Sequence, residues 1–191
     1  MKITLSPQSL EIIDKLENGS GHLFITGKAG TGKSTLLQHF RLHTKIPLVV
    51  LAPTGVAAVH IGGETIHSFF RFAPGVTKKE ARSDAFFTED RELYRKLEMI
   101  IIDEISMVRS DLLDCVDTFL RIVRDDDRAF GGIRMVFFGD LYQLPPVVTS
   151  REYETFRTIY PSEWFFDSIV MQSILQSDTE RVELIELTTI Y

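Results

Sequence analysis

The chain has 191 residues, of which 44% are hydrophobic, and a formal net charge of −6. A chain of this length can bury roughly 70% of its unfolded surface, so we expect one folded domain without cross-links. Its single cysteine excludes an internal disulfide. No apolar run approaches the ~18 residues of a membrane span, and the N-terminus lacks the apolar core of a signal peptide. These features argue against a membrane or disulfide-rich secreted protein and favour the reducing cytoplasm.

The negative charge is concentrated near the C-terminus. Residues 1–149 carry 18 Lys and Arg against 19 Asp and Glu, whereas residues 150–191 carry 3 against 8. A broad basic face that binds nucleic acid through charge alone is therefore excluded. Any contact with DNA must depend on a local set of hydroxyls, backbone amides and a few cations.

The first predicted element is an amphipathic helix that begins after Ser6. Ser6 is a suitable N-cap, and Pro7 is a suitable first helical residue. Leu10, Ile13 and Leu16 follow, and we expect them to form the buried face.

A phosphate-binding loop follows the first predicted strand. Residues 22–26 predict a buried parallel strand, residues 27–34 match the pattern G-x-x-x-x-G-K-[ST], and residues 34–42 predict a helix. In this context the loop amides bind phosphate, the Lys33 ammonium reaches the β and γ oxygens, and the Ser34 hydroxyl binds Mg²⁺. The sequence therefore predicts a nucleoside triphosphate site. The alternative is a glycine-rich turn followed by Lys and Ser by chance.

A second predicted strand, residues 48–51, leads to another helix start. Thr54 and Gly55 lie at this start, where a hydroxyl and free N–H groups suit a DNA phosphate.

The segment 65–70 is open to two interpretations. Its spacing alone favours a structural role, because a histidine among apolar residues is usually structural and the nearby phenylalanines are typical of a core. Alternatively, one exposed phenylalanine in or just after this segment stacks on a nucleic-acid base. The phenylalanines concerned are Phe69, Phe70 and Phe72.

Two carboxylates end the next predicted strand. Residues 99–102 are apolar throughout and are followed by Asp103 and Glu104. Ligands bind at the carboxyl ends of parallel strands, so Asp103 is suited to hold Mg²⁺ and Glu104 to act as general base toward water. The presence of Glu104 beside Asp103 favours a site that hydrolyses the nucleotide over a switch-type site. The alternative is that Glu104 is only a solvated acid at a strand end.

A further strand, residues 133–138, places Gln143 at the same sheet edge. A carboxamide can donate to a γ-phosphate and accept from water, which makes Gln143 a candidate sensor of that phosphate. The alternative is an idle glutamine beside a Pro-Pro turn.

The remaining segments carry no motif of their own. A helix is predicted from Ser110, in which Cys115 is more typical of a core than of a nucleophile. A charged helix is predicted at about 89–97, where mixed-sign charge is typical of a solvated face, although arginines near it could meet DNA. The final residues, 182–191, predict a strand.

Five segments occur in a specific order: 27–35 (GKAGTGKST), 52–63 (APTGVAAVHIGG), 64–70 (ETIHSFF), 100–108 (IIIDEISMV) and 139–147 (GDLYQLPPV). Together they resemble the first motor domain of the Pif-type DNA helicases, the RecD-like branch of helicase superfamily one. The resemblance runs from about Leu5 to the C-terminus. It implies an α/β fold of the three-layer P-loop NTPase type, with a RecA-like parallel sheet flanked by helices.

The resemblance also implies an activity. Such motors use ATP and Mg²⁺ to translocate on single-stranded DNA from 5′ to 3′ and to unwind duplexes, with roles in DNA repair, DNA recombination and telomere maintenance. The alternative is a P-loop ATPase that acts on protein partners. Stimulation of nucleotide binding or hydrolysis by single-stranded DNA distinguishes the two.

The resemblance assigns roles to single residues. The catalytic residues are Lys33, Glu104 and Gln143. The nucleotide-binding residues are Gly27, Ala29, Gly30, Thr31, Gly32, Lys33, Ser34 and Thr35, with Gln8 as the adenine candidate. The metal ligands are Ser34 and Asp103, and the DNA-binding residues are Thr54, Gly55, His67 and Ser68. For Gln8, helix capping or a surface position is the alternative.

The family's further parts set two expectations. A small wedge subdomain is expected at 149–162, with an aromatic patch on the core as the alternative. In the family an arginine follows the last strand. The present sequence ends before that position, so we expect 1–191 to be one motor domain, with the second motor domain absent. Loss of such an arginine costs about 10³ to 10⁵ in turnover, so we expect this chain alone to hydrolyse ATP barely detectably. The sequence leaves the oligomeric state open.

Overall fold

One parallel sheet forms the centre of the computed structural model, which describes residues 6–143 and 145–188. The sheet has six strands, and all of its neighbouring pairs run parallel. Their spatial order is β3 (Glu64–Thr65), β2 (Leu48–Ala52), β4 (Met99–Ile102), β5 (Arg134–Gly139), β1 (His22–Gly27) and β6 (Val182–Leu187). The predicted parallel α/β sheet is confirmed.

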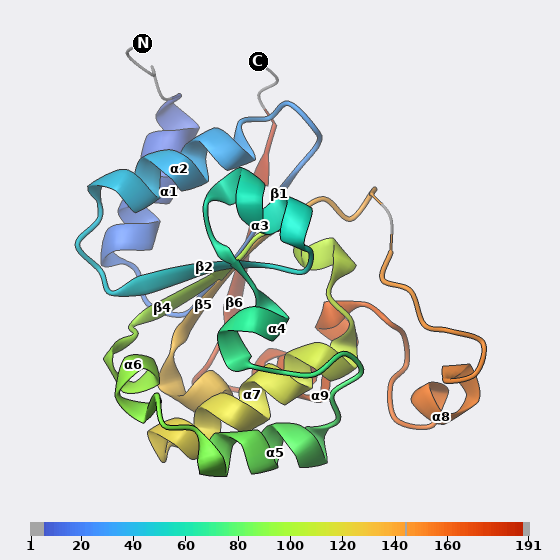
Figure 1. Cartoon of the computed structure of the whole chain (residues 1–191). Helices are drawn as coiled ribbons and strands as arrows, with labels where there is room; N and C mark the ends of the chain where they lie inside the picture. Colours follow the sequence, from blue (N-terminus) through green and yellow to red (C-terminus); the bar gives the residue numbers. More distant parts are fainter. Residues whose placement is uncertain (1–5, 144, 189–191) are drawn as a thin grey trace.

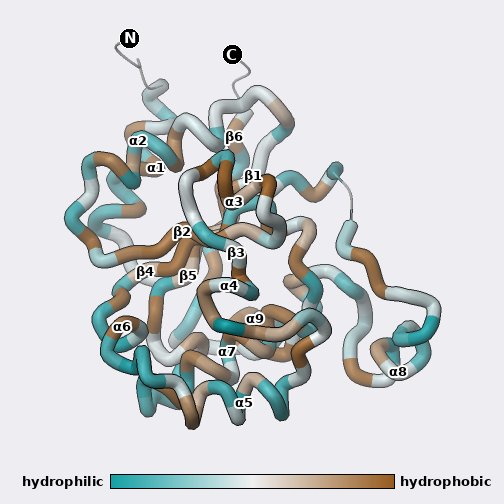
Figure 2. Tube along the Cα trace, in the orientation of Figure 1, coloured by the Kyte–Doolittle hydropathy of each residue, from teal (hydrophilic) through white to brown (hydrophobic). Residues whose placement is uncertain are grey.

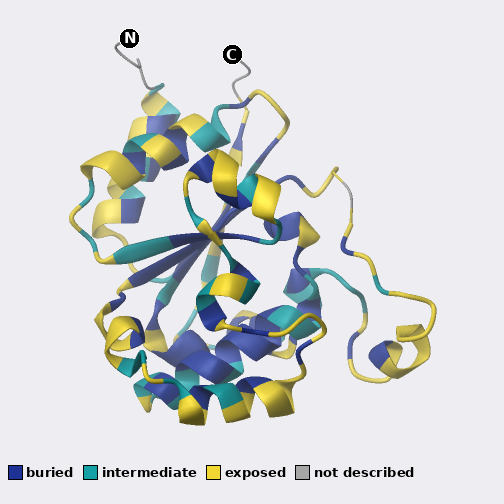
Figure 3. Cartoon of the chain, in the orientation of Figure 1, coloured by how far each residue is buried: buried dark blue, intermediate teal, exposed yellow. Residues whose placement is uncertain are grey.

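The sheet is buried on both faces, which produces three layers. Along β4, Ile100 and Ile102 belong to one hydrophobic cluster, whereas Met99 and Ile101 belong to another. This alternation follows from the two-residue period of a strand, and it requires an apolar residue at every position. Figure 2 shows the hydrophobic strands at the centre, and Figure 3 shows them buried.

Helices cover each face of the sheet (Figure 1). One hydrophobic cluster contains residues of α1 (Pro7–Asn18), α2 (Lys33–His43) and α3 (Gly55–Ile61). The other contains residues of α4 (Ile66–Phe70), α5 (Lys78–Phe87), α6 (Arg91–Lys96), α7 (Ser110–Arg124) and α9 (Ile169–Leu175). The predicted three-layer arrangement is therefore confirmed. None of the helices in the described part of the chain is long and apolar enough to cross a membrane.

The first helix begins as predicted but buries a different face. The Ser6 hydroxyl accepts a hydrogen bond from the Ser9 N–H at 3.0 Å, and Pro7 is the first helical residue. The prediction that Leu10 is buried is wrong, since this residue is 56% exposed. Leu16 is buried as predicted and Ile13 is partly buried, whereas the fully buried Ile12 was not predicted. Two apolar residues at positions 12 and 13 make the sequence pattern compatible with either face, and packing on the sheet selects Ile12.

The phenylalanines after His67 belong to the core. Phe70 and Phe72 are buried, and Phe69 is half-buried. The Phe70 ring lies 5.3 Å from the Phe119 ring of α7 and 5.9 Å from the Tyr94 ring of α6. The structural interpretation of these aromatic residues is therefore confirmed, and none of the three is exposed as a stacking platform.

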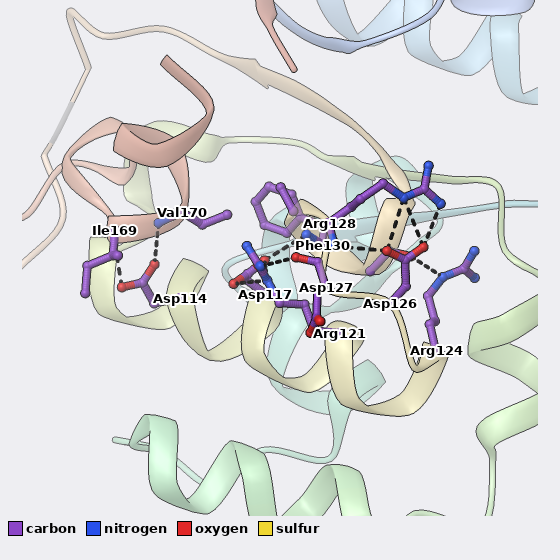
Figure 4. Close-up of polar contacts among 12 residues, drawn as sticks. Asp114, Asp117, Arg121, Arg124, Asp126, Asp127, Arg128, Phe130, Ile169 and Val170 are labelled. Carbon is purple, nitrogen blue, oxygen red and sulfur yellow. Dashed lines mark hydrogen bonds and ion pairs between the residues drawn. The ribbon is translucent and has the colours of Figure 1, made fainter. Parts of the chain in front are cut away.

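Buried carboxylates on α7 hold the neighbouring backbone (Figure 4). Asp117 accepts hydrogen bonds from the Phe130 N–H at 2.7 Å and from Arg121 Nε at 2.8 Å. This contact fixes the turn η2 (Ala129–Gly132), which leads into β5. Cys115 on the same helix is buried, and burial raises the pKa of its thiol to about 12. Its predicted role as a core residue is confirmed.

The segment 149–168 is tied to the first turns of α7. It contains α8 (Tyr153–Arg157), which stands outside the main body in Figure 1, and the turn η3 (Phe165–Asp167). The Tyr160 hydroxyl donates to Asp114 Oδ2 at 2.9 Å, and the Ser110 N–H donates to the Glu163 carbonyl at 3.0 Å. Tyr160 is buried, and its ring packs against the Phe156 ring of the same segment, with the centroids 5.0 Å apart. The wedge role of residues 149–162 stays a prediction.

The last predicted strand is shorter than expected. The strand β6 ends at Leu187, and residues 189–191 lie outside the described residues. The charged helix α6 is also shorter than its predicted range. Two arginines in this region bind backbone within the protein: Arg91 donates to the Ala85 carbonyl at 3.0 Å and Arg95 to the Val123 carbonyl at 3.2 Å.

A buried histidine makes the stability of the fold depend on pH. His22 is 7% exposed, and its Nδ1 accepts a hydrogen bond from the Met135 N–H at 3.0 Å, so the ring is held neutral. Burial and the neighbouring Arg134 lower the pKa of His22 from 6.5 to about 4. The unfolded chain binds the proton more readily, so stability is complete above pH 6.5 and falls toward pH 4.

We expect the wild-type chain to lose about 3 kcal/mol of unfolding free energy from this histidine between pH 6.5 and pH 4. The variant His22→Asn retains an acceptor oxygen but does not titrate, so its unfolding free energy should change less over the same interval. Urea unfolding at both pH values measures the difference. Equal pH dependence in the two proteins would contradict the assignment.

Candidate functional site

Three loops leave the sheet side by side at its carboxyl edge. Thr26 of β1 pairs with Gly139 of β5, and Phe137 of β5 pairs with Ile102 of β4. Because the strands are parallel and in this register, the loops that follow β1, β4 and β5 begin close together, the loop after β4 slightly before the other two. The predicted phosphate loop, carboxylates and glutamine therefore share one edge, as expected for a ligand site in an α/β sheet.

Glycines shape the loop after β1. Gly30 and Gly32 have φ values of 82° and 85°, which L residues with side chains rarely adopt. A Cβ atom on Gly27 would lie 2.7 Å from the Thr31 hydroxyl and 2.8 Å from the Leu187 carbonyl oxygen. The loop is therefore tightly folded against the end of β6, as required of a backbone cradle for phosphate.

Lys33 and Ser34 occupy the first turn of the helix that follows this loop. The Lys33 ammonium lies over the loop, where it donates to the carbonyl of Gly27 and to that of Lys28 at 3.2 Å. Ser34 is half-buried in the same turn. A helix N-terminus, loop amides and one ammonium group thus meet at a single point, a suitable environment for phosphate.

The carboxylate of Asp103 lies beside these cationic groups. Asp103 is 6% exposed, and its N–H donates to the Leu51 carbonyl at 2.8 Å, which continues the ladder of β2 and β4. Burial, together with the adjacent Glu104, raises the pKa of Asp103 to about 6, while Lys33 and His60 oppose this rise. A cation bound here would stabilise the ionised carboxylate.

Glu104 has an unusual backbone conformation. Its φ and ψ are 52° and 43°, in the left-handed region that residues other than glycine occupy only at a cost. Its Oε2 atom is buried and has no hydrogen-bond partner within the described residues. Strained backbone and an unpaired buried carboxylate oxygen are features that cluster at functional sites.

Gln143 is exposed and is held by Asp140. The Gln143 side-chain amide donates to Asp140 Oδ2 at 3.4 Å, and the Tyr142 N–H donates to Asp140 Oδ1 at 3.0 Å. Asp140 is only 5% exposed, so it anchors the loop that carries Gln143. Sequence reasoning missed Asp140, although an aspartate at a strand end is a typical start of a turn closed by its own side chain.

Gln8 lies on α1, next to the last strand. Its side-chain amide donates to the Glu186 carbonyl at 2.8 Å and so joins α1 to β6. This contact gives Gln8 a structural role, and its contact with adenine stays a prediction.

The two candidate DNA-binding segments follow neighbouring strands. Ala52 of β2 pairs with Thr65 of β3, and Thr54 and His67 lie two residues beyond these positions. The pairing brings the start of α3 next to the start of α4. The structure therefore places both segments at the same edge of the sheet as the phosphate loop.

Thr54 and Gly55 begin α3. The Thr54 hydroxyl accepts a hydrogen bond from the Ala57 N–H at 3.3 Å. A Cβ atom on Gly55 would meet nothing within 4 Å, so the fold itself does not require glycine there. A glycine in open space on the surface suits the close approach of a partner backbone.

His67 and Ser68 lie in the first turn of α4. His67 is half-buried, and burial lowers its pKa below the usual 6.5. The Ser68 N–H donates to the Thr65 hydroxyl at 3.0 Å, and the Ser68 hydroxyl donates to Glu64 Oε2 at 3.4 Å. Thr65 is thus the helix cap, a role that a threonine just before the helical residues could have indicated.

The site contains suitable oxygen ligands for a metal ion. No group of three or more His, Cys, Asp or Glu side chains that could hold one occurs within the described ranges, 6–143 and 145–188. Mg²⁺ does not require such a group, because it typically binds one or two protein oxygens together with substrate phosphates and water. The Ser34 hydroxyl and the buried Asp103 carboxylate fit that role.

The sequence is similar to curated DNA helicases. A family model described as "PIF1-like helicase" matches residues 7–182. The chain is 42% identical over 156 residues to the ATP-dependent DNA helicase PIF1 of Candida albicans, covering 76% of this chain and 17% of that protein. It is 40% identical over 154 residues to the ATP-dependent DNA helicase Pif1 of Bdellovibrio bacteriovorus. That match covers 76% of this chain and 34% of the Bdellovibrio protein.

Solved structures agree with this similarity. The crystal structure of Pif1 helicase from Bacteroides in complex with ADP-AlF3 and ssDNA matches with a TM-score of 0.88 and 38% identity, over 100% of this chain and 43% of that one. The chain thus spans less than half the length of each of these relatives. The family match covers most of the sequence, and its fold and motifs agree with it, so the chain belongs to the PIF1-like helicase family.

Proposed function

We propose that this chain is the nucleotide-binding motor domain of a DNA helicase that hydrolyses ATP with Mg²⁺, translocates on single-stranded DNA from 5′ to 3′ and unwinds duplexes. One observation carries the proposal: the parallel sheet brings Lys33, Asp103 and Glu104 to the same edge as the Thr54 and His67 segments. An ATPase that acts on protein partners would give no reason for the Thr54 and His67 segments to lie at this edge. The Bacteroides relative, described as bound to ssDNA and ADP-AlF3, supports the same conclusion.

The chemistry follows from the residues at this edge. The loop amides and the Lys33 ammonium bind the β and γ phosphates, and Glu104 accepts a proton from the attacking water. The water oxygen bonds to the γ phosphorus as the bond to the β–γ bridging oxygen breaks, which releases ADP and phosphate. Mg²⁺, held by Ser34 and Asp103, would neutralise phosphate charge when bound.

Gln143 fits a sensor role within this scheme. Its exposed carboxamide is joined to a buried carboxylate by a single long hydrogen bond of 3.4 Å, which a γ-phosphate could replace. Gln8 is the adenine candidate in the same proposal. Residues 149–162 would act as the wedge, and a second motor domain would complete the ATP cleft. A DNA substrate and a single buried cysteine fit a reducing compartment such as the cytoplasm.

Binding of a fluorescent oligothymidine, followed by anisotropy with and without Mg·ADP, tests the proposal. We expect binding that weakens as salt rises, because phosphate contacts release counterions. We also expect it to change when nucleotide binds. A chain that binds Mg·ADP but no oligonucleotide at low salt would favour the protein-directed ATPase instead.

Within this experiment, His67→Ala should weaken oligonucleotide binding about fivefold, the effect of losing one hydrogen bond of about 1 kcal/mol. Affinity for Mg·ATP without DNA should remain equal to that of the wild type. The control is His39→Ala, since His39 lies on α2 and stacks on His43 with ring centroids 4.2 Å apart. If His67→Ala reduced both affinities together, this histidine would support the fold rather than DNA.

A further inference from the structure

The loop after β4 contains two buried polar atoms without partners. Within residues 6–143 and 145–188, Glu104 Oε2 and Ser106 Oγ are the buried side-chain atoms that form no hydrogen bond. Ser106 is completely buried, at 0% exposed. A buried hydroxyl without a partner destabilises the folded state, because it loses its hydrogen bonds to water and gains none in return. Two such atoms, two residues apart and beside the nucleotide site, require an explanation.

The backbone holds both residues in one tight turn. The Met107 N–H donates to the Glu104 carbonyl at 3.0 Å, and the Val108 N–H donates to the Ile105 carbonyl at 2.9 Å. Residues Ile105–Met107 form the turn η1, and Glu104 precedes it in the left-handed conformation. The Glu104 side chain therefore does not point in the direction that a helical backbone at this position would give it.

The end of β5 packs directly against this turn. A Cβ atom on Gly139 would lie 2.8 Å from Ile105 Cγ2 and 3.3 Å from the Ser106 nitrogen. Even a methyl group would not fit there without a shift, so the Ser106 backbone cannot move toward β5. Ser106 is short and fixed, whereas Glu104 has a longer side chain that can change rotamer. Any rearrangement that joins the two must come from Glu104.

The two unpaired atoms are chemically complementary. A serine hydroxyl donates one hydrogen bond, and an ionised carboxylate only accepts. A hydrogen bond between them would satisfy both atoms, and bonds to an ionised group are about twice as strong as neutral ones. Another buried serine close in sequence, Ser110, already donates its hydroxyl to the Ser162 carbonyl at 3.1 Å. Burial of a serine in this region therefore does not by itself leave the hydroxyl without a partner.

We propose that Ser106 is a positioning residue for Glu104. In the nucleotide-loaded site the Ser106 hydroxyl donates to one carboxylate oxygen of Glu104, which leaves the other oxygen to accept from the attacking water. The bond fixes the base at the moment when its orientation affects the barrier. This inference rests on the proposed hydrolytic function, and it adds a residue to which that function assigns no role.

The test compares two ligands of the wild-type chain and of Ser106→Ala. Mg·ADP probes the nucleotide site alone, and Mg·ADP with aluminium fluoride mimics the transferring phosphoryl group with its water. We expect Ser106→Ala to leave the Mg·ADP affinity unchanged and to weaken the aluminium fluoride complex about tenfold. Ser106→Cys, of nearly the same size but a weaker donor, should have an intermediate effect.

A double-mutant cycle tests whether Ser106 acts through Glu104. With Glu104→Ala in place, adding Ser106→Ala should cause no further loss, because the acceptor is already gone. Equal losses in both backgrounds would overturn the inference. So would an equal effect of Ser106→Ala on the two ligands, since that indicates a structural role.

Thermal melting provides the folding control. Ser106→Ala removes an unpaired hydroxyl, so its melting temperature without ligand should match or exceed that of the wild type. Ser110→Ala removes a paired hydroxyl and should melt lower, with no preference between the two ligands. A wild-type chain that binds neither ligand would refute the proposed function itself. A wild type that binds both, with Ser106→Ala indistinguishable from it, would refute only the role of Ser106.

Discussion

Replacing Lys33 by alanine is expected to abolish the stabilisation that Mg·ADP or Mg·ATP gives the folded chain. The Lys33 ammonium lies over the phosphate loop and donates to the Gly27 carbonyl, and it is the cation placed to reach the β and γ oxygens. At a hundredfold excess over Kd, a ligand stabilises a protein by about 2.7 kcal/mol. For a domain of this size the wild-type melting temperature should rise by about 5–11 °C.

Differential scanning fluorimetry measures this shift, and Lys28→Ala is the matched control. Lys28 is an exposed lysine of the same loop, and its backbone carbonyl, which survives the substitution, accepts from Lys33 at 3.2 Å. The control should retain most of the nucleotide shift. A full shift in Lys33→Ala would show that nucleotide binds elsewhere.

Replacing Asp114 by alanine should destabilise the fold strongly, because this carboxylate joins three separate donors. It is 1% exposed and accepts from the Tyr160 hydroxyl at 2.9 Å and from the Val170 and Ile169 N–H groups at 3.0 and 3.3 Å. Its loss leaves the Tyr160 hydroxyl and the Val170 N–H buried without an acceptor, and it removes the acceptor of the partly buried Ile169 N–H. We expect a loss of about 3–5 kcal/mol, as for breaking a buried charged contact, and a fall in melting temperature of about 6–20 °C.

Limited proteolysis would locate this effect within the molecule. Because Asp114 ties the segment 149–168 to α7, the variant should be cleaved in that segment sooner than the wild type. Asp178→Ala, at a position near the start of β6, serves as the control for losing one negative charge. Equal melting temperatures for Asp114→Ala and Asp178→Ala would disprove the anchoring role.

The parallel sheet and the nucleotide site at its carboxyl edge could be predicted, because the sequence patterns that indicate them are local. A strand buried on both faces must be apolar at every position, as residues 99–102 are, and the glycines of a phosphate loop follow a fixed spacing. Parallel strands then bring their carboxyl ends together, so Lys33, Asp103 and Glu104 meet without further information.

Other features could not be predicted, because distant contacts decide them. Ile12 and Ile13 fit different helical faces equally well, and only packing on the sheet selects Ile12. Gln8 meets Glu186 through the pairing of the first and last parts of the chain. Ser106 and Asp140 lie within the segments 100–108 and 139–147, but the sequence assigns neither residue a role. Their importance becomes visible only when burial and missing or formed hydrogen bonds are known.

The contact between Gly27 and Leu187 has a mechanical consequence. These residues lie far apart in the sequence, yet a single methyl group on Gly27 would touch the Leu187 carbonyl oxygen. Among the described strands, β6 lies at the edge of the sheet and pairs with β1. The chain therefore leaves β6 directly beside the phosphate loop. Because the two backbones are in contact, the phosphate loop cannot move toward Leu187 without displacing the end of β6.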